Sequence, residues 1–220
     1  MTITSSQTNP TSIPAPAPDP RELLAKAVVT GATVIAGVSP GQMGDPTPCD
    51  QYDVRGLLGH LVTVLDRIAA IGRGDNPFGV APVTGIADDG WLTAWSLRAG
   101  EAIDAWADDA SLTRIVRVPW SELPGAATLG GYLNEITVHT WDIATATGQQ
   151  PVWDDEVLGV AFAAIRHALP ADGRAAALAA AAANVPAGVP VGPPPFADAV
   201  PVADAAPLID RLVAWNGRRP

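Results

Sequence analysis

The chain has 220 residues, 48% of them hydrophobic, and a formal net charge of −10. This length and apolar content indicate a globular protein with a sizeable core and exclude a chain that is disordered throughout. The acidic balance, with no basic cluster, argues against a nucleic acid or an anionic membrane as a partner.

Cysteine content and hydrophobic runs narrow the class further. The single cysteine, Cys49, excludes an internal disulfide and a cysteine-rich zinc site, so a metal would need histidine and carboxylate ligands. No run of 18 apolar residues occurs, so we expect no membrane helix. Residues 1–18 are rich in Pro, Ser and Thr and lack the features of a secretory signal. We expect a disordered leader on a cytoplasmic protein.

Apolar residues recur every three or four positions along much of the chain, which predicts helices. Asp19 and Asp53 are suited to cap the first two helices, and Gly148 is suited to end the fourth. The segment after Asp53 has the strongest pattern. The predicted helices cover about 19–37, 53–72, 89–108, 127–147, 154–168 and 204–216.

Two stretches break the helical pattern. Residues 113–120, "TRIVRVPW", alternate and are β-branched, which predicts a short strand before a turn at "ELPG". The alanine tract after Pro170 can be helical, but it gives way to a proline-rich segment. We therefore predict an all-α protein, a four-helix bundle with a short β or irregular insert and a C-terminal extension.

This organisation gives three parts. Residues 1–18 are the leader and 19–150 the four-helix bundle, which we expect to bind a metal. Residues 151–220 form a helical, Pro- and Ala-rich extension packed on the bundle.

The predicted fourth helix carries a polar pair on an apolar background. Glu135 and His139 are four residues apart, so their side chains project about 40° apart around the axis and roughly 6 Å apart along it. Burying an ionised carboxylate is costly unless it is paired or bound to a metal. The pair is therefore either two polar residues on a wet helix face or two ligands of a divalent cation.

A third ligand is needed, and His60 is the candidate. It lies among apolar residues in the middle of the predicted second helix, where a bundle could bring it to Glu135 and His139. Two histidines and one glutamate leave open positions on the metal, as in a catalytic site. The alternative is that His60 is a hydrogen-bonded core residue. His167 lies near the end of a predicted helix, where a positive charge interacts favourably with the helix dipole, and this accounts for its position.

Other polar residues have open roles. Asp142 shares the face of His139 and could be a fourth ligand, an acceptor that orients His139, or a salt-bridge partner. Cys49 is a candidate thiol, but a small buried apolar group is the favoured interpretation. Five arginines could meet an anionic substrate, although surface charge is the simpler account. These are Arg55, Arg98, Arg114, Arg117 and Arg218.

Three stretches, "TPCDQYDVRGLLGHLV", "EITVHTWDIATATGQ" and "VADAAPLIDRLVAWNGRRP", carry a resemblance. Together they resemble the metal-binding proteins of the DinB and mycothiol-dependent maleylpyruvate isomerase superfamily, in particular its short stand-alone members. The resemblance covers about 20–150 and 196–220. It implies a four-helix bundle with a divalent metal, zinc or else nickel, held by His60, Glu135 and His139.

The resemblance also implies an activity. Such proteins use the metal to activate a low-molecular-weight thiol such as mycothiol, for transfer or isomerisation on a small electrophilic substrate; Asp142 would orient His139. Two alternatives stay open: a metal-dependent hydrolase that uses metal-bound water, and a non-catalytic bundle that binds a metal or small molecule. We expect no nucleic-acid or membrane partner, and a monomer or homodimer.

Overall fold

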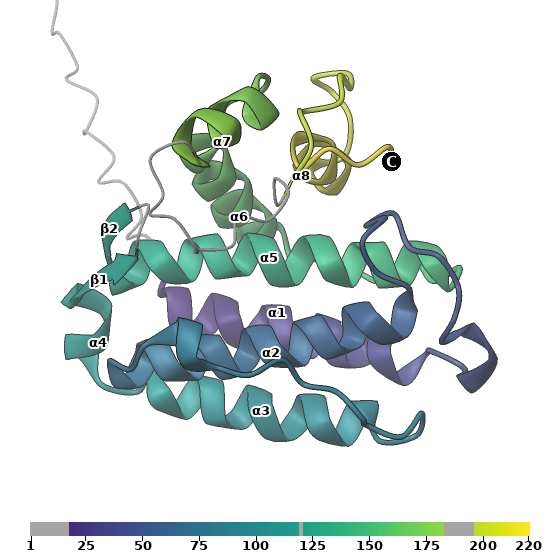
Figure 1. Cartoon of the computed structure of the whole chain (residues 1–220), viewed down its shortest axis with the longest axis horizontal. Coiled ribbons are helices and arrows are strands. Elements are labelled where there is room, and N and C mark those ends of the chain that lie inside the picture. Colours follow the sequence, from purple (N-terminus) through teal and green to yellow (C-terminus); the bar gives the residue numbers. More distant parts are fainter. Residues whose placement is uncertain (1–17, 119–120, 183–195) are drawn as a thin grey trace, which may run out of the picture.

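Four long helices form the body of the protein (Figure 1). The structure, a computed structural model, describes residues 18–118, 121–182 and 196–220. Helix α5 lies across α1 and α2, and α3 packs on the other side of α1 and α2. The prediction of an all-α, four-helix bundle is confirmed. Its helices are α1 (Pro20–Ala36), α2 (Val54–Arg73), α3 (Trp91–Ala105) and α5 (Gly125–Ala146).

The shorter elements connect or extend the bundle. Single 3₁₀ turns, η1 (Pro40–Gln42) and η2 (Pro77–Gly79), lie in the loops that follow α1 and α2. Helix α4 (Asp109–Thr113) and the strands β1 (Ile115–Val118) and β2 (Ser121–Pro124) link α3 to α5. The extension contains α6 (Asp155–Ala168), α7 (Arg174–Ala182) and α8 (Leu208–Trp215).

Local side-chain chemistry fixes the ends of these helices as predicted. The Asp19 carboxylate accepts a hydrogen bond from the amide of Arg21, and the Asp53 carboxylate accepts one from the amide of Gly56. Both bonds satisfy amides that have no partner inside the helix. Helix α2 ends at Gly74, whose φ of 89° suits a residue without a Cβ atom.

Several boundaries differ from prediction; the last helix, for example, was predicted from about residue 204 and begins at Leu208. The third helix was predicted to reach residue 108 but ends at Ala105, because the Asp108 carboxylate caps the separate helix α4. The stretch "ELPG" was predicted to be a turn, which is wrong. Its first three residues belong to β2, which pairs antiparallel with β1 so that Pro124 lies opposite Ile115, and α5 begins at Gly125.

Two buried tryptophans hold α3 against its neighbours. The indole N–H of Trp95 donates to the carbonyl oxygen of Val28 in α1, and that of Trp106 donates to Ile68 in α2, both at 2.9 Å. Each indole thus buries a large apolar surface and satisfies its polar atom. Close approach of α1 to Trp95 requires glycine at position 31.

The extension packs on the bundle through α6, which contacts α1 and α5, while α8 contacts α5 and α6 (Figure 1). Nearly all of the predicted leader, residues 1–17, and the proline-rich segment 183–195 lie outside the described residues. Among the described helices, none combines the length and apolar character needed to cross a membrane.

We expect Gly31→Ala to destabilise the protein by about 1–3 kcal/mol, because the new Cβ would lie 2.5 Å from the Trp95 ring. The matched control is Gly100→Ala on the exposed face of α3, where a Cβ meets no atom within 4 Å. It should be neutral or slightly stabilising. Urea unfolding of both variants measures the difference, and equal midpoints would contradict this account of the α1–α3 contact.

Candidate metal centre

The structure brings His60 of α2 together with Glu135 and His139 of α5. The Nε2 atom of His60 lies 3.0 Å from Oε1 of Glu135, and Nε2 of His139 lies 3.7 Å from the same oxygen. The side chains are 17%, 25% and 6% exposed, respectively. The three residues, which are the candidate metal ligands, thus form a partly buried cluster, hereafter called the metal centre.

The spacing of these atoms fits a divalent cation. Ligands about 2.1 Å from a metal, at angles of 90–110°, lie about 3.0–3.4 Å from one another. The two nitrogen–oxygen distances, 3.0 and 3.7 Å, lie at and slightly above this range, and one nitrogen of each histidine and one carboxylate oxygen all lie within 4.8 Å of each other. The donor set, two imidazoles and one carboxylate, suits zinc and related metals and leaves coordination positions free.

Asp142 contacts the His139 ring at Nδ1, the nitrogen that does not face Glu135. Its Oδ2 atom lies 3.0 Å from Nδ1 of His139, and its side chain is completely buried. A carboxylate at Nδ1 keeps the proton of a neutral imidazole on that nitrogen. The Nε2 atom, on the side of Glu135, then has a free lone pair that can bind a metal. Of the roles considered for Asp142, this contact matches the orienting acceptor, and an ion pair with Arg218 matches the salt-bridge partner as well.

Arg218, from the tail after α8, pairs with the same carboxylate. Its Nε donates to Oδ1 of Asp142 at 3.1 Å and its Nη2 donates to Oδ2 at 2.8 Å. Its Nη1 donates to the carbonyl oxygen of Asn216, so the guanidinium is held at both ends. The interpretation of Arg218 as a surface charge is wrong, because the side chain is 6% exposed.

Two further contacts fix the tail on the bundle near the metal centre. Asn216 and Asn134 of α5 exchange side-chain hydrogen bonds of 2.8 and 3.2 Å, and both are buried. Phe196, which precedes α8, contacts both the bundle and the tail: its ring lies 6.3 Å from the His139 ring and 5.4 Å from the guanidinium carbon of Arg218. The extension therefore contributes one wall of the site.

Charge pairing sets the protonation of the metal centre when no metal is bound. Burial opposes ionisation of Glu135, but hydrogen bonds from His139 and His60 outweigh it and lower the pKa of the carboxyl. Burial also opposes a charge on His139. The carboxylates of Asp142 and Glu135 outweigh it and raise the pKa of His139 to about 9.

Cys49 lies beside the centre rather than within it. Its sulfur is within 4.8 Å of a ring nitrogen of His139 and a carboxylate oxygen of Asp142. Burial raises the pKa of the thiol, and the side chain is nearly inaccessible, as the interpretation of a small buried group predicts. The position next to His139 was not predicted, because nothing in the local pattern relates the loop before α2 to α5.

The remaining candidates lie elsewhere. His167 is exposed in the last turn of α6. Three arginines form ion pairs with nearby acids: Arg55 with Asp88, Arg98 with both Asp66 and Glu101, and Arg117 with Glu122. Arg114 donates to the carbonyl oxygens of Ile71 and Gly72, which end α2. None of these residues contacts the metal centre.

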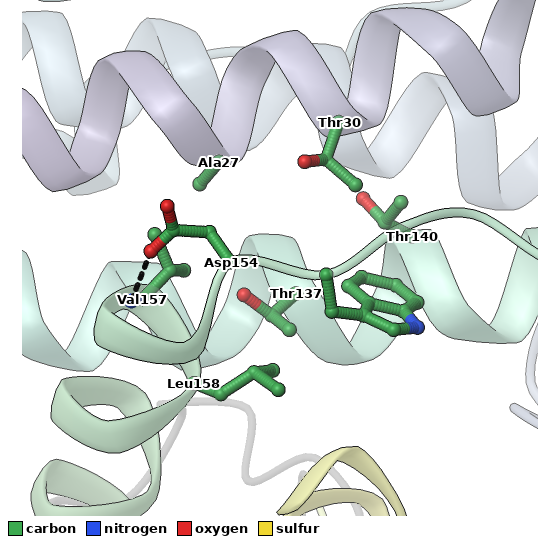
Figure 2. Close-up of a pocket in the computed structure, with 8 residues that line it drawn as sticks. Ala27, Thr30, Thr137, Thr140, Asp154, Val157 and Leu158 are labelled. Carbon is green, nitrogen blue, oxygen red and sulfur yellow. Dashed lines mark hydrogen bonds between the residues drawn. The ribbon is translucent and has the colours of Figure 1, made fainter.

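A small cavity lies on the opposite side of α5 (Figure 2). Thr137 and Thr140 line it, and they are about 200° and 140° around the helix from Glu135. The hydroxyl of Thr140 is buried and has no hydrogen-bond partner. The helix itself therefore separates this cavity from the metal centre.

Comparison with known proteins agrees with this architecture. The model of the family described as "Mycothiol maleylpyruvate isomerase N-terminal domain" matches residues 24–144, more than half of the chain. The chain belongs to this family. The match includes all four bundle helices and the three residues of the metal centre, and it confirms the relationship predicted from the sequence.

Two curated relatives come from Mycobacterium tuberculosis, the uncharacterized proteins MT0763 of strain CDC 1551 and Rv0738 of strain H37Rv. Each is 28% identical over 188 residues, which is 85% of this chain and 91% of the relative. The crystal structure of the mycothiol-dependent maleylpyruvate isomerase has the same fold, with a TM-score of 0.55 at 12% identity over 74% of this chain and 73% of that one. The crystal structure of a variant of that isomerase, with one histidine replaced by alanine, matches with a TM-score of 0.54, at 13% identity over 69% of this chain and 70% of that one.

We expect Arg218→Met to destabilise the protein by about 3–5 kcal/mol, because it leaves the buried Asp142 carboxylate without its main counter-charge. Arg219→Met, at the adjacent exposed position, is the control and should change the stability by less than about 0.5 kcal/mol. Urea unfolding curves measure both. An Arg218→Met protein as stable as the control would show that Asp142 does not depend on this pair.

Proposed function

We propose that this protein is a metal-dependent enzyme that activates a low-molecular-weight thiol, mycothiol or a close analogue, for transfer to or isomerisation of a small electrophilic substrate. The observation that carries the proposal is the convergence of His60, Glu135 and His139 from two helices. Zinc is the metal that this donor set favours, and nickel is the alternative.

The family and the donor set support thiol chemistry at this metal. When bound, a divalent cation supplies the positive charge that lowers the pKa of a thiol and holds the thiolate beside its target. Three protein ligands leave room for such a sulfur. The protein's own thiol is a poor candidate, because Cys49 is buried and its pKa is raised. The reacting thiol is therefore external.

The side chains around the proposed site have separate tasks. His60, Glu135 and His139 bind the metal, and Asp142 holds the Nδ1 proton of His139 so that Nε2 faces Glu135. Arg218 holds the Asp142 carboxylate in place through two hydrogen bonds, in a position away from the reacting groups. Tyr52, stacked 5.3 Å from the ring of His60, and Phe196, stacked on His139, limit access of water.

The same proposal includes the organisation of the chain. Residues 19–150 act as the metal-binding bundle, and 151–220 act as an extension that completes it, after a leader of residues 1–18. The substrate and the thiol are small molecules, the protein works in the cytoplasm, and it acts as a monomer or a homodimer.

The first test is metal content. We expect the wild-type protein, after incubation with zinc and desalting, to retain about one zinc per chain, and His60→Ala and His139→Ala to lose most of it. His167→Ala, an exposed histidine outside the centre, is the matched control and should retain the metal. Elemental analysis gives the ratio. Equal, negligible zinc in all four proteins would overturn the metal proposal.

The second test addresses the thiol. Calorimetric titration with mycothiol should give saturable heat in the zinc-loaded protein and none in the metal-free protein, because the sulfur binds only where the metal leaves a position free. A thiol-free analogue with the same sugar framework is the control ligand. If metal binds but mycothiol gives no metal-dependent heat, a hydrolase or a non-catalytic metal-binding bundle replaces the thiol enzyme.

The third test is pH dependence. Below its pKa of about 9, metal-free His139 carries a proton that a metal must displace, so the zinc affinity should rise with pH up to that value. We expect an increase of about tenfold per pH unit, or about 100-fold between pH 6 and 8. Competition with a chelator of known pH dependence measures it, and an affinity that does not change would contradict the assignment of His139.

A further inference from the structure

Three arginines of the extension surround one pair of aromatic rings. Phe162 of α6 and Trp215 of α8 meet edge to face with ring centres 6.3 Å apart. The guanidinium carbon of Arg166 lies 5.5 Å from the Phe162 ring and 5.2 Å from the Trp215 ring. Arg211 lies 5.2 Å from Phe162, and Arg174 of α7 lies 5.9 Å from Trp215. These five residues are called the arginine–aromatic cluster.

The cluster has positive charge without a matching acid. Within the described part of the chain, Arg166 and Arg211 make only these ring contacts, with neither an ion pair nor a side-chain hydrogen bond. The carboxylate of Asp198 acts on Arg174 through its charge, but its oxygens accept hydrogen bonds from the backbone amides of Gly173 and Arg174. Such a gathering is unexpected in a protein with 23 acidic and 13 basic residues, where most arginines could find an acid.

Two buried donors in the cluster also have no partner. The Nε and Nη1 atoms of Arg174 donate to the carbonyl oxygens of Pro170 and Ala197, but its Nη2 is buried and makes no hydrogen bond. The indole Nε1 of Trp215 is likewise buried and unpartnered. Arg174 is only 4% exposed, so an unmet charged donor there costs free energy that an acceptor would recover.

We propose that the arginine–aromatic cluster is a binding site for a compact oxyanion, the carboxylate or phosphate group of a small molecule. The rings hold the guanidinium groups of Arg166 and Arg211 in place, so little side-chain entropy remains to be lost on binding. Guanidinium groups recognise planar carboxylates and phosphates by paired hydrogen bonds. Arg166 is exposed, so its guanidinium group can be reached from solvent.

The cluster is separate from the metal centre but joined to it by a short segment. Phe196 contacts His139, and the next residue, Ala197, accepts the hydrogen bond from Arg174. Asp198 then binds the first amides of α7. The site therefore does not rest on the proposed thiol chemistry, and it can be tested on the protein without metal, substrate or thiol.

The test follows the indole N–H resonances of the full chain in ¹⁵N–¹H spectra during titration. Trp215→Phe identifies the resonance of Trp215 by its disappearance. We expect that resonance to shift saturably with inorganic phosphate or malonate and not with sodium chloride at the same ionic strength. A response to phosphate alone assigns a phosphate ligand, a response to malonate alone assigns a carboxylate, and a response to both assigns a compact anion of either kind.

Matched variants decide whether the arginines are responsible. Arg166→Gln and Arg211→Gln should each weaken the apparent affinity by about tenfold or more, the loss expected for a hydrogen bond between charged groups. Arg117→Gln, an exposed arginine paired with Glu122 in the hairpin, should leave the affinity unchanged. The proposal is overturned if the Trp215 resonance does not move, if chloride moves it equally, or if both cluster variants bind as the wild type does.

Discussion

The buried carboxylate of Asp142 is the constraint on which the arrangement around the metal centre depends. An ionised carboxylate with no exposed surface costs several kcal/mol unless cations and donors surround it. Here the carboxylate meets the guanidinium of Arg218 on one side and the Nδ1 atom of His139 on the other. The same pairing that makes burial tolerable also fixes the ring of His139, so stability and the direction of a proposed ligand atom have one cause.

This constraint explains why the extension is part of the site and not an appendage. The bundle alone would leave Asp142 without Arg218 and Asn134 without Asn216, two buried polar groups unsatisfied. Docking of the tail after α8 satisfies both at once. The helices thus supply the proposed metal ligands, and the tail supplies the charge that keeps one of them oriented.

Periodicity and capping residues were sufficient to predict the bundle, because the helices are amphipathic and the first two begin at aspartates whose carboxylates bind the first amides. The i,i+4 spacing of Glu135 and His139 was enough to place them side by side, and the apolar neighbours of His60 pointed to the same interior. Arg218 could not be distinguished from Arg219, since both follow α8 in an irregular tail. The turn at Gly217, with φ of 82°, decides which one faces inward, and that turn depends on packing against Ala197.

Four arginines of the extension lie over aromatic rings, and two of them, Arg218 and Arg166, differ in one respect. Arg218 lies over Phe196 and has its anion within the protein, the Asp142 carboxylate. Arg166 lies over Phe162 and Trp215, and the described residues offer it no anion. Orienting a cation by stacking is useful only where an acceptor meets it. In the first case that acceptor is a residue on α5; in the second, it is the oxyanion that we propose to bind from solution.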